Sequence, residues 1–330
     1  MKWPALKIET EAGEEEAVAP LVLSASRVTD IPAFHGEWFM QRLRAGYCRR
    51  VNPFNRGQES LISFARCRLI VFWSKNPAPF MRHIDELEER GLSFYFQFTL
   101  NDYEREKLEP RLPPLEQRLR TFMDLSERIG RERVIWRFDP VLLGDGLEAE
   151  DIIGRLEAIG RKLNGHTDKL VFSFVDMYKK TKERLKKIDP GFRAPERGDM
   201  LRIAGGIAAI NREWPRPLAL STCAEEIELA AMGISRNQCV DPALIRRLCG
   251  NDAGISEFYA PRPEGAALKN SGLRARCACA PSRDIGAYNT CPHFCAYCYA
   301  NHSAPRPGAG DFQAFSRKYM DSGSRPSRRP

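Results

Sequence analysis

The feature that most constrains the fold is an alternation of short apolar runs with longer stretches of helical character, which begins at Leu21. Each apolar run is rich in Val, Ile, Phe and Leu, which is typical of a strand buried on both faces of a parallel sheet. The predicted strands are LVLSAS (21–26), CRLIVFW (67–73), LSFYFQFTL (92–100), RVIWRFDPVLL (133–143), KLVFSFV (169–175) and PLALSTC (217–223).

Helical segments fill the intervals between these runs, at residues 81–91, 115–130 and 149–163. Gly91 and Gly130 stand where a glycine commonly ends a helix. Strands that alternate with helices at this spacing predict an α/β fold with a parallel sheet, and six or more such units favour a (β/α) barrel. An open sheet is the alternative that the sequence leaves.

The two ends of the chain differ in composition from the middle. Residues 1–17 are acidic and have no clear hydrophobic period, so we expect a loose N-terminal arm. Residues 303–330 are rich in Pro, Gly, Ser and Arg, a composition typical of a disordered basic tail. The barrel is therefore expected to span residues 18–302 and to include a cysteine-rich cluster region at 277–302.

Charge and hydropathy limit the partners. The formal net charge of +8 is spread along the chain, which permits an anionic partner without requiring one. Met1 to Lys7 lack the apolar core of a secretion signal, and no apolar run reaches the roughly 20 residues that cross a bilayer. We therefore expect a cytoplasmic protein with no membrane partner. In that reducing compartment, ten cysteines indicate metal binding or redox chemistry rather than disulfides.

Polar side chains stand at the C-terminal end of nearly every predicted strand, where chemistry gathers in parallel α/β folds. Helix capping explains some of them. Alternation points Arg137 and Asp139 to the same side of an apolar strand, which an internal salt bridge and a ligand contact explain equally well. The candidate catalytic residues are Arg137, Asp139 and Lys75, and the candidate cofactor-binding residues are Arg27, Asp30, Asn76 and Asn101.

Three cysteines near the C-terminus, Cys291, Cys295 and Cys298, have the spacing C-x3-C-x2-C. Three thiolates on one compact loop can each hold one iron of a [4Fe-4S] cubane and leave the fourth iron free for a chelating substrate. A zinc site is the alternative, with His293 or His302 as the fourth ligand. The spacing differs from the paired C-x2-C of most zinc sites, so we favour the iron–sulfur cluster.

Four further cysteines form a second candidate metal site. They are Cys223 at a strand end, Cys239, and the pair Cys277 and Cys279. Four thiolates can ligate a second [4Fe-4S] cluster or a zinc ion. Buried cysteines can instead pack as small hydrophobic residues, which suits Cys223 better than the pair in its polar stretch. Between the metals we favour iron–sulfur because of the neighbouring motif.

The cysteine spacing resembles that of the radical S-adenosylmethionine (SAM) superfamily, including the aromatic Tyr297 before the last cysteine. The YCYA ending at 297–300 is similar to that of its spore photoproduct lyase-like branch. The resemblance implies S-adenosylmethionine as a cofactor, with Tyr297 beside it, and cleavage to a 5′-deoxyadenosyl radical that abstracts hydrogen from a substrate. An electron donor such as flavodoxin or ferredoxin is the expected partner.

The position of the motif departs from that superfamily, in which it follows the first barrel strand. Here it is almost last, so we expect residues 283–289 to form a strand beside the one at 21–26. The chain would then be a circularly permuted radical-SAM-type partial TIM barrel with a C-terminal iron–sulfur loop. A structure with residues 283–289 outside the sheet would contradict this hypothesis.

A longer match covers nearly the whole chain. SASRVTDIPAF (24–34), FWSKNP (72–77), FQFTLNDYE (96–104) and VIWRFDP (134–140), with the cysteine-rich end, resemble a prokaryotic family, domain of unknown function 1848. The resemblance implies an iron–sulfur protein and supplies no substrate.

Two functions follow from these patterns. The leading hypothesis is a radical SAM enzyme of unknown substrate, with nucleic acid among the candidates. The alternative is a non-catalytic zinc or iron–sulfur protein that binds nucleic acid through an arginine-rich tail, Arg317, Arg325, Arg328 and Arg329.

Overall fold

The computed structural model describes residues 3–52, 55–260 and 277–301. The predicted basic tail at 303–330, with its four arginines, lies outside the described residues, and so does His302.

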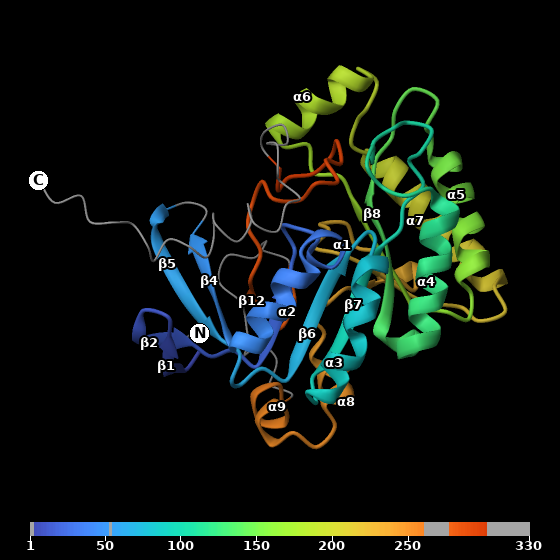
Figure 1. The fold of residues 1–330 in the computed structure, drawn as a ribbon. Coiled ribbons are helices and arrows are strands. Elements are labelled where there is room, and N and C mark those ends of the chain that lie inside the picture. Colours follow the sequence, from blue (N-terminus) through green and yellow to red (C-terminus); the bar gives the residue numbers. More distant parts are fainter. Residues whose placement is uncertain (1–2, 53–54, 261–276, 302–330) are drawn as a thin grey trace, which may run out of the picture.

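An eight-stranded, all-parallel sheet forms the centre of the molecule, in the order β11-β10-β9-β8-β7-β6-β3-β12 (Figure 1). The predicted parallel sheet is confirmed, and each of the six apolar runs contains one strand. Among the described strands, β11 and β12 end the sheet and each have one neighbour. The bounds are β3 Val22–Ala25, β6 Leu69–Ser74, β7 Ser93–Thr99, β8 Val134–Val141, β9 Lys169–Phe174, β10 Ala219–Thr222, β11 Ser235–Arg236 and β12 Arg283–Asp284.

The last strand pairs with the first strand of this sheet. Arg283 of β12 lies opposite Leu23 of β3, and Asp284 lies opposite Ser24, in parallel register. The prediction that the segment before the cysteine motif joins the sheet beside residues 21–26 is therefore confirmed, although the strand is short and residues 285–289 continue as a loop. From β3 to β11 the neighbours follow chain order, so β12 is out of sequential order.

Amphipathic helices cover one face of the sheet because their apolar stripes pack against its aromatic side chains. Phe72 of β6 stacks on Phe96 of β7 with ring centroids 4.9 Å apart, and both belong to the core beneath these helices. Two predicted helices match α4 and α5, whereas the one at 81–91 is split into η1 and α3. The elements are α1 Ile31–Phe34, α2 Gly36–Ala45, η1 Ala78–His83, α3 Ile84–Glu89, α4 Leu115–Ile129, η2 Arg131–Arg133, α5 Ala149–Leu163 and α7 Arg197–Glu213.

The other face carries a second, smaller core. Val71 of β6, Ile135 of β8 and Val171 of β9 pack there against α8 (Pro242–Cys249) and α9 (Ala253–Phe258). These two helices lie at one end of the sheet, and α6 (Lys179–Ile188) lies at the opposite end (Figure 1). A short η3 (Ala230–Met232) precedes β11. None of the described helices is both long and apolar enough to cross a membrane.

The acidic N-terminal segment is ordered, which corrects the expected loose arm. β1 (Ala5–Thr10) and β2 (Gly13–Val18) form an antiparallel hairpin, which joins β4 (Tyr47–Asn52) and β5 (Asn55–Ser63) in a four-stranded sheet. Its charged side chains alternate with a few that reach a small apolar cluster, Ile8, Ala17, Tyr47 and Leu61. That partial burial holds the hairpin although its sequence is mostly acidic.

Candidate metal centre

The segment that carries the three cysteines crosses the C-terminal ends of the central strands. After β12 it contacts residues that follow β3, β6 and β7, and it lies at the same end of the sheet as α6 (Figure 1). Polar residues beyond the strand ends therefore surround the cysteine loop, in the position where parallel α/β folds assemble their sites.

Asp284 fixes the start of this loop. Its carboxylate accepts hydrogen bonds from Ser24 Oγ (2.8 Å), Ser26 Oγ (2.8 Å) and the backbone amides of Arg27 (2.9 Å) and Gly286 (2.9 Å). A Cβ at position 286 would lie 1.9 Å from Ser26 Oγ, so only glycine fits against β3. The first turn of the cysteine loop is thus locked to the first strand of the sheet.

We expect Asp284→Ala to lower the free energy of unfolding by about 2–4 kcal/mol, because it leaves several partly buried donors without an acceptor. The midpoint of urea denaturation measures this loss. Asp124→Ala, at an exposed position of α4, is the control and should change the midpoint little. Equal midpoints for the two variants would contradict the anchoring role of Asp284.

The three cysteines sit in a compact, largely buried loop. The Cys298 amide donates to the Cys295 carbonyl (3.0 Å), and Asn301 Nδ2 donates to the Cys291 carbonyl (2.7 Å). Arg184 of α6 donates to the carbonyls of Cys298 and Asn301 and so ties the helix to the loop. Burial raises the pKa of the Cys291 thiol to about 12 and also raises that of Cys295, on which the charges of Cys291 and Cys298 act.

A buried polar network surrounds the Tyr297 hydroxyl. It accepts hydrogen bonds from Lys75 Nζ (2.9 Å) and Asn101 Nδ2 (3.0 Å) and donates to Glu109. Lys75 Nζ also binds Glu109 Oε1 at 2.8 Å. The Tyr297 ring lies 6.1 Å from the ring of Tyr103, so the side chain points into the core. Its predicted place beside a cofactor stays a prediction.

Opposite charges keep Lys75 and Glu109 ionised despite their burial. Burial acts to lower the pKa of Lys75, but the acidic groups around it, Glu109 first among them, together outweigh burial and hold the pKa above its usual value. Burial acts to raise the pKa of Glu109, but Lys75 and Arg118 hold it below its usual value. Arg118 Nη1 lies 3.6 Å from Glu109 Oε2. Sequence reasoning missed Glu109 because it stands in a charged loop with no pattern of its own.

Asp30 organises the other side of the loop. Its carboxylate accepts from Ser74 Oγ (2.7 Å) and the Lys75 amide (2.8 Å), and it caps α1 through the Ala33 amide (3.0 Å). His293 Nε2 lies 2.8 Å from Asp30 Oδ2. The contact occupies Nε2 alone, and Nδ1 has no hydrogen-bond partner among the described residues, so the zinc alternative stays open.

The four cysteines of the second candidate site lie near one another. Cys223 Sγ lies 3.5 Å from Cys239 Sγ, and the Cys239 amide donates to Cys279 Sγ (3.2 Å). Hydrogen bonds from Cys223 and then Cys279 hold the pKa of the Cys239 thiol well below its usual range. A hydrogen bond from Cys279 lowers the pKa of Cys277 to about 6. Among the described residues, no three Cys, His, Asp or Glu side chains surround a single metal position.

Arg137 links the two groups of cysteines. Its guanidinium donates to Cys239 Sγ (3.1 Å) and forms a partly buried salt bridge with Asp139. The Asp139 amide donates to Asn101 Oδ1 (2.9 Å), and Asn101 contacts Tyr297. The internal salt bridge that the sequence offered as one alternative is therefore present, and the ligand contact stays a prediction.

Two of the predicted cofactor-binding residues, Arg27 and Asn76, lie at the edge of the candidate site. Arg27 packs over the Trp73 ring with its Cζ 5.1 Å from the centroid, and Arg137 Cζ lies 5.3 Å from the same ring. Asn76 contributes its backbone amide to Ser74 Oγ (3.0 Å), but its side chain makes no hydrogen bond to the described residues. Arg27 thus belongs to the strand-end group, whereas the Asn76 side chain does not join it.

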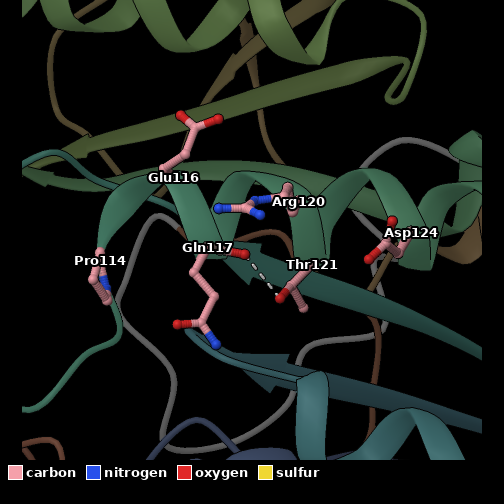
Figure 2. A pocket seen from close by; sticks show the side chains of 6 residues that line it. All are labelled: Pro114, Glu116, Gln117, Arg120, Thr121 and Asp124. Atoms are coloured by element: carbon pink, nitrogen blue, oxygen red, sulfur yellow. Dashed lines mark hydrogen bonds between the residues drawn. The ribbon is translucent and has the colours of Figure 1, made fainter.

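A surface depression elsewhere contains none of the predicted site residues. It lies along α4, and Figure 2 shows the side chains that line it, which are Pro114, Glu116, Gln117, Arg120, Thr121 and Asp124. This surface carries no cysteine.

Fold and site together define an α/β protein with an eight-stranded parallel sheet and two groups of cysteines at its strand ends. The chain belongs to the family described as Domain of unknown function (DUF1848), whose model matches residues 22–300. The family resemblance found in the sequence is thereby confirmed, and the match runs from β3 to the end of the cysteine loop. No curated protein and no solved structure matches the chain.

Proposed function

We propose that this protein is a radical S-adenosylmethionine enzyme in which Cys291, Cys295 and Cys298 hold a [4Fe-4S] cluster. The observation that carries the proposal is one compact loop with three thiols, folded over the C-terminal strand ends and next to buried charges. Such a donor set fits three irons of a cubane and leaves the fourth iron open. A zinc ion with three thiolates and one imidazole is the alternative; His293 would be its fourth ligand through Nδ1, which has no hydrogen-bond partner among the described residues, with Nε2 held by Asp30.

When bound, the cluster would supply the electron that cleaves S-adenosylmethionine to methionine and a 5′-deoxyadenosyl radical. The residues around the loop would hold the cluster and orient the side chains beside it. Lys75 lies close enough to Cys295 for its charge to act on that thiol, so the lysine offsets negative charge at the loop. Glu109 and Asn101 fix the Lys75 and Tyr297 side chains in place. Arg27 and Asp30 flank the other end of the loop and are proposed to bind cofactor.

The strand order supports a circularly permuted partial barrel. If β12 is counted first, the eight strands follow one another in sequential order across the sheet. The cysteine loop then follows the first strand, as the motif does in the superfamily that the spacing resembles. We propose that the sheet curves as a partial barrel around the strand-end residues.

Anaerobic reconstitution with iron and sulfide tests the proposed function. The expected result is about four irons bound at this loop, an electron paramagnetic resonance signal on reduction, and 5′-deoxyadenosine formed from S-adenosylmethionine. A reduced, iron-loaded protein that forms no 5′-deoxyadenosine would overturn the proposal. Zinc bound at these cysteines, without iron, would support the non-catalytic alternative instead.

The surface next to the loop fits an acidic electron donor. Five exposed lysines of α6, at positions 179, 180, 182, 186 and 187, form no ion pair with any residue that the structure describes. Tyr178 (52% exposed), Ile188 (48%) and Tyr299 (43%) are large exposed apolar side chains on this helix and the cysteine loop. Exposed apolar residues with charge around them are typical of a docking surface. Arg184 joins α6 directly to the loop.

Reversing this charge should slow reduction by an acidic flavodoxin or ferredoxin. We expect Lys180→Glu/Lys186→Glu/Lys187→Glu to reduce the rate about tenfold or more at low salt, because steering charges act mainly on association. Reduction by dithionite should not change. The control is Arg120→Glu/Arg212→Glu, at exposed positions of α4 and α7. Equal rates for both variants with the protein donor would contradict docking on α6.

A further inference from the structure

Three separate segments bring four thiols together on the face of the sheet that carries the smaller core. Cys223 directly follows β10, Cys239 follows β11, and Cys277 and Cys279 precede β12. Cys223 Sγ and Cys239 Sγ are 3.5 Å apart, and thiol contacts continue from Cys239 to Cys279 and from Cys279 to Cys277. The Ala280 amide donates to the Val240 carbonyl (2.9 Å), which holds two of the segments together.

The surrounding groups are arranged as donors to sulfur. Arg137 Nη1 lies 3.1 Å and Asn237 Nδ2 lies 2.9 Å from Cys239 Sγ. The backbone amides of Cys239 and Val240 lie 3.2 and 3.4 Å from Cys279 Sγ. N–H groups directed at sulfur stabilise metal-bound thiolates and tune their potential. Thiols that pack only as small apolar groups have no need of four such donors.

The positive charge near these four cysteines and their partial exposure to solvent also favour a metal site. Four metal-bound thiolates carry net negative charge in both a [4Fe-4S] and a zinc centre, so a buried cation beside them is stabilising. Arg137 is 2% exposed and donates to Cys239 directly, and Arg27 lies close enough for the charges of Cys239 and Cys279 to act on it. Cys223 and Cys277 are half-buried, which leaves a route for a metal from solvent.

We infer that Cys223, Cys239, Cys277 and Cys279 bind a second, fully thiolate-ligated metal centre, either an iron–sulfur cluster or a zinc ion. The 3.5 Å sulfur separation is close to the roughly 3.8 Å expected between thiolates on one tetrahedral zinc with Zn–S bonds of about 2.3 Å. The thiols contact one another pairwise and do not enclose one metal position among the described side chains, so the metal draws them together as their protons are lost. The centre is independent of the proposed cluster at the C-terminal loop, because it shares no ligand with it.

Metal analysis of a variant without the first site tests this inference. In Cys291→Ala/Cys295→Ala/Cys298→Ala, purified without oxygen, we expect one centre per chain to remain. About four irons with acid-labile sulfide would identify an iron–sulfur cluster. About one zinc without sulfide would identify a zinc site, which X-ray absorption at the zinc edge would show as four sulfur ligands. Both results support the inference, and only trace metal in the folded variant overturns it.

Further substitutions assign the centre to these four residues. Adding Cys239→Ser to the triple variant should remove the remaining metal. If the variant with Cys239→Ser does not fold, Cys223→Ser replaces it in the test, because Cys223 is only half-buried. Adding Cys249→Ser should leave the metal in place, because this thiol donates to the Arg68 carbonyl at 4.0 Å, away from the four cysteines. Retention of the metal in both test variants, or a Cys223–Cys239 disulfide in metal-free protein isolated without oxygen, overturns the inference. Failure of S-adenosylmethionine cleavage in the native chain would leave these measurements unchanged.

Discussion

We expect Cys295→Ala to abolish formation of 5′-deoxyadenosine from S-adenosylmethionine, down to the background of iron-free protein. Cys295 is 5% exposed and its neighbours Ala296 and Tyr297 belong to the main core. Its removal takes one of three ligands from the proposed cluster, and two thiolates cannot hold the cubane with a single open iron. The variant should also lose the visible absorbance and the iron of this loop.

The fold should survive this substitution. The Ala296 amide donates to the Leu108 carbonyl (2.8 Å), so the loop keeps its backbone attachment when only one sulfur is removed. Circular dichroism and the unfolding midpoint check that point. Cys249→Ala is the matched control, a thiol outside both cysteine groups, and it should cleave S-adenosylmethionine at the native rate. Native iron content and cleavage in Cys295→Ala would remove the C-terminal loop from consideration as the cluster site.

The central sheet was predictable because strands buried on both faces leave a nearly continuous apolar signal. The strands of the second sheet leave no such signal. β2 reads GEEEAV and β4 reads YCRRVN, and their stability comes from long-range partners such as the Arg49–Glu15 ion pair. β11 and β12 have two residues each, too few for any periodicity. Their places in the sheet depend on tertiary contacts, such as those of Asp284, rather than on local sequence.

The site was predictable to the extent that strand ends converge. Arg137 and Asp139 lie in the C-terminal part of β8 and Asn101 lies just after β7, so parallel packing alone brings them to one edge. The path of a loop could not be predicted in this way. Glu109 follows β7 by ten residues, yet the loop returns it to Lys75 and Tyr297. The contact between His293 Nε2 and Asp30 was likewise not predictable, because Asp30 is distant in sequence and only the path of the loop brings the two side chains together.

Glu109→Ala is expected to lower the free energy of unfolding by about 3 kcal/mol, because it leaves the largely buried Lys75 without its carboxylate partner and leaves Arg118 with Glu104 alone, at 3.8 Å. Lys75 and Arg118 both contact Glu109, whose side chain is 3% exposed, and Arg118 is 1% exposed. The control is Glu116→Ala, which removes the 2.6 Å ion pair with Lys162 at the surface of α4. That exposed pair should contribute little, because water and salt screen it. Urea denaturation of the metal-free proteins at neutral pH measures both.

The pH dependence gives this prediction a second, independent readout. The pKa of Glu109 is lower in the folded protein than in the unfolded chain, because Lys75 and Arg118 outweigh the cost of burial. Its stabilising contribution is therefore complete above the unfolded value of about 4.3 and is lost as pH falls through the lower folded value. The stability difference between native protein and Glu109→Ala should accordingly narrow below about pH 4. A small difference at neutral pH, equal to that of Glu116→Ala, would mean that Lys75 and Arg118 reach solvent when Glu109 is removed, and the network could not hold Tyr297 rigidly at the cysteine loop.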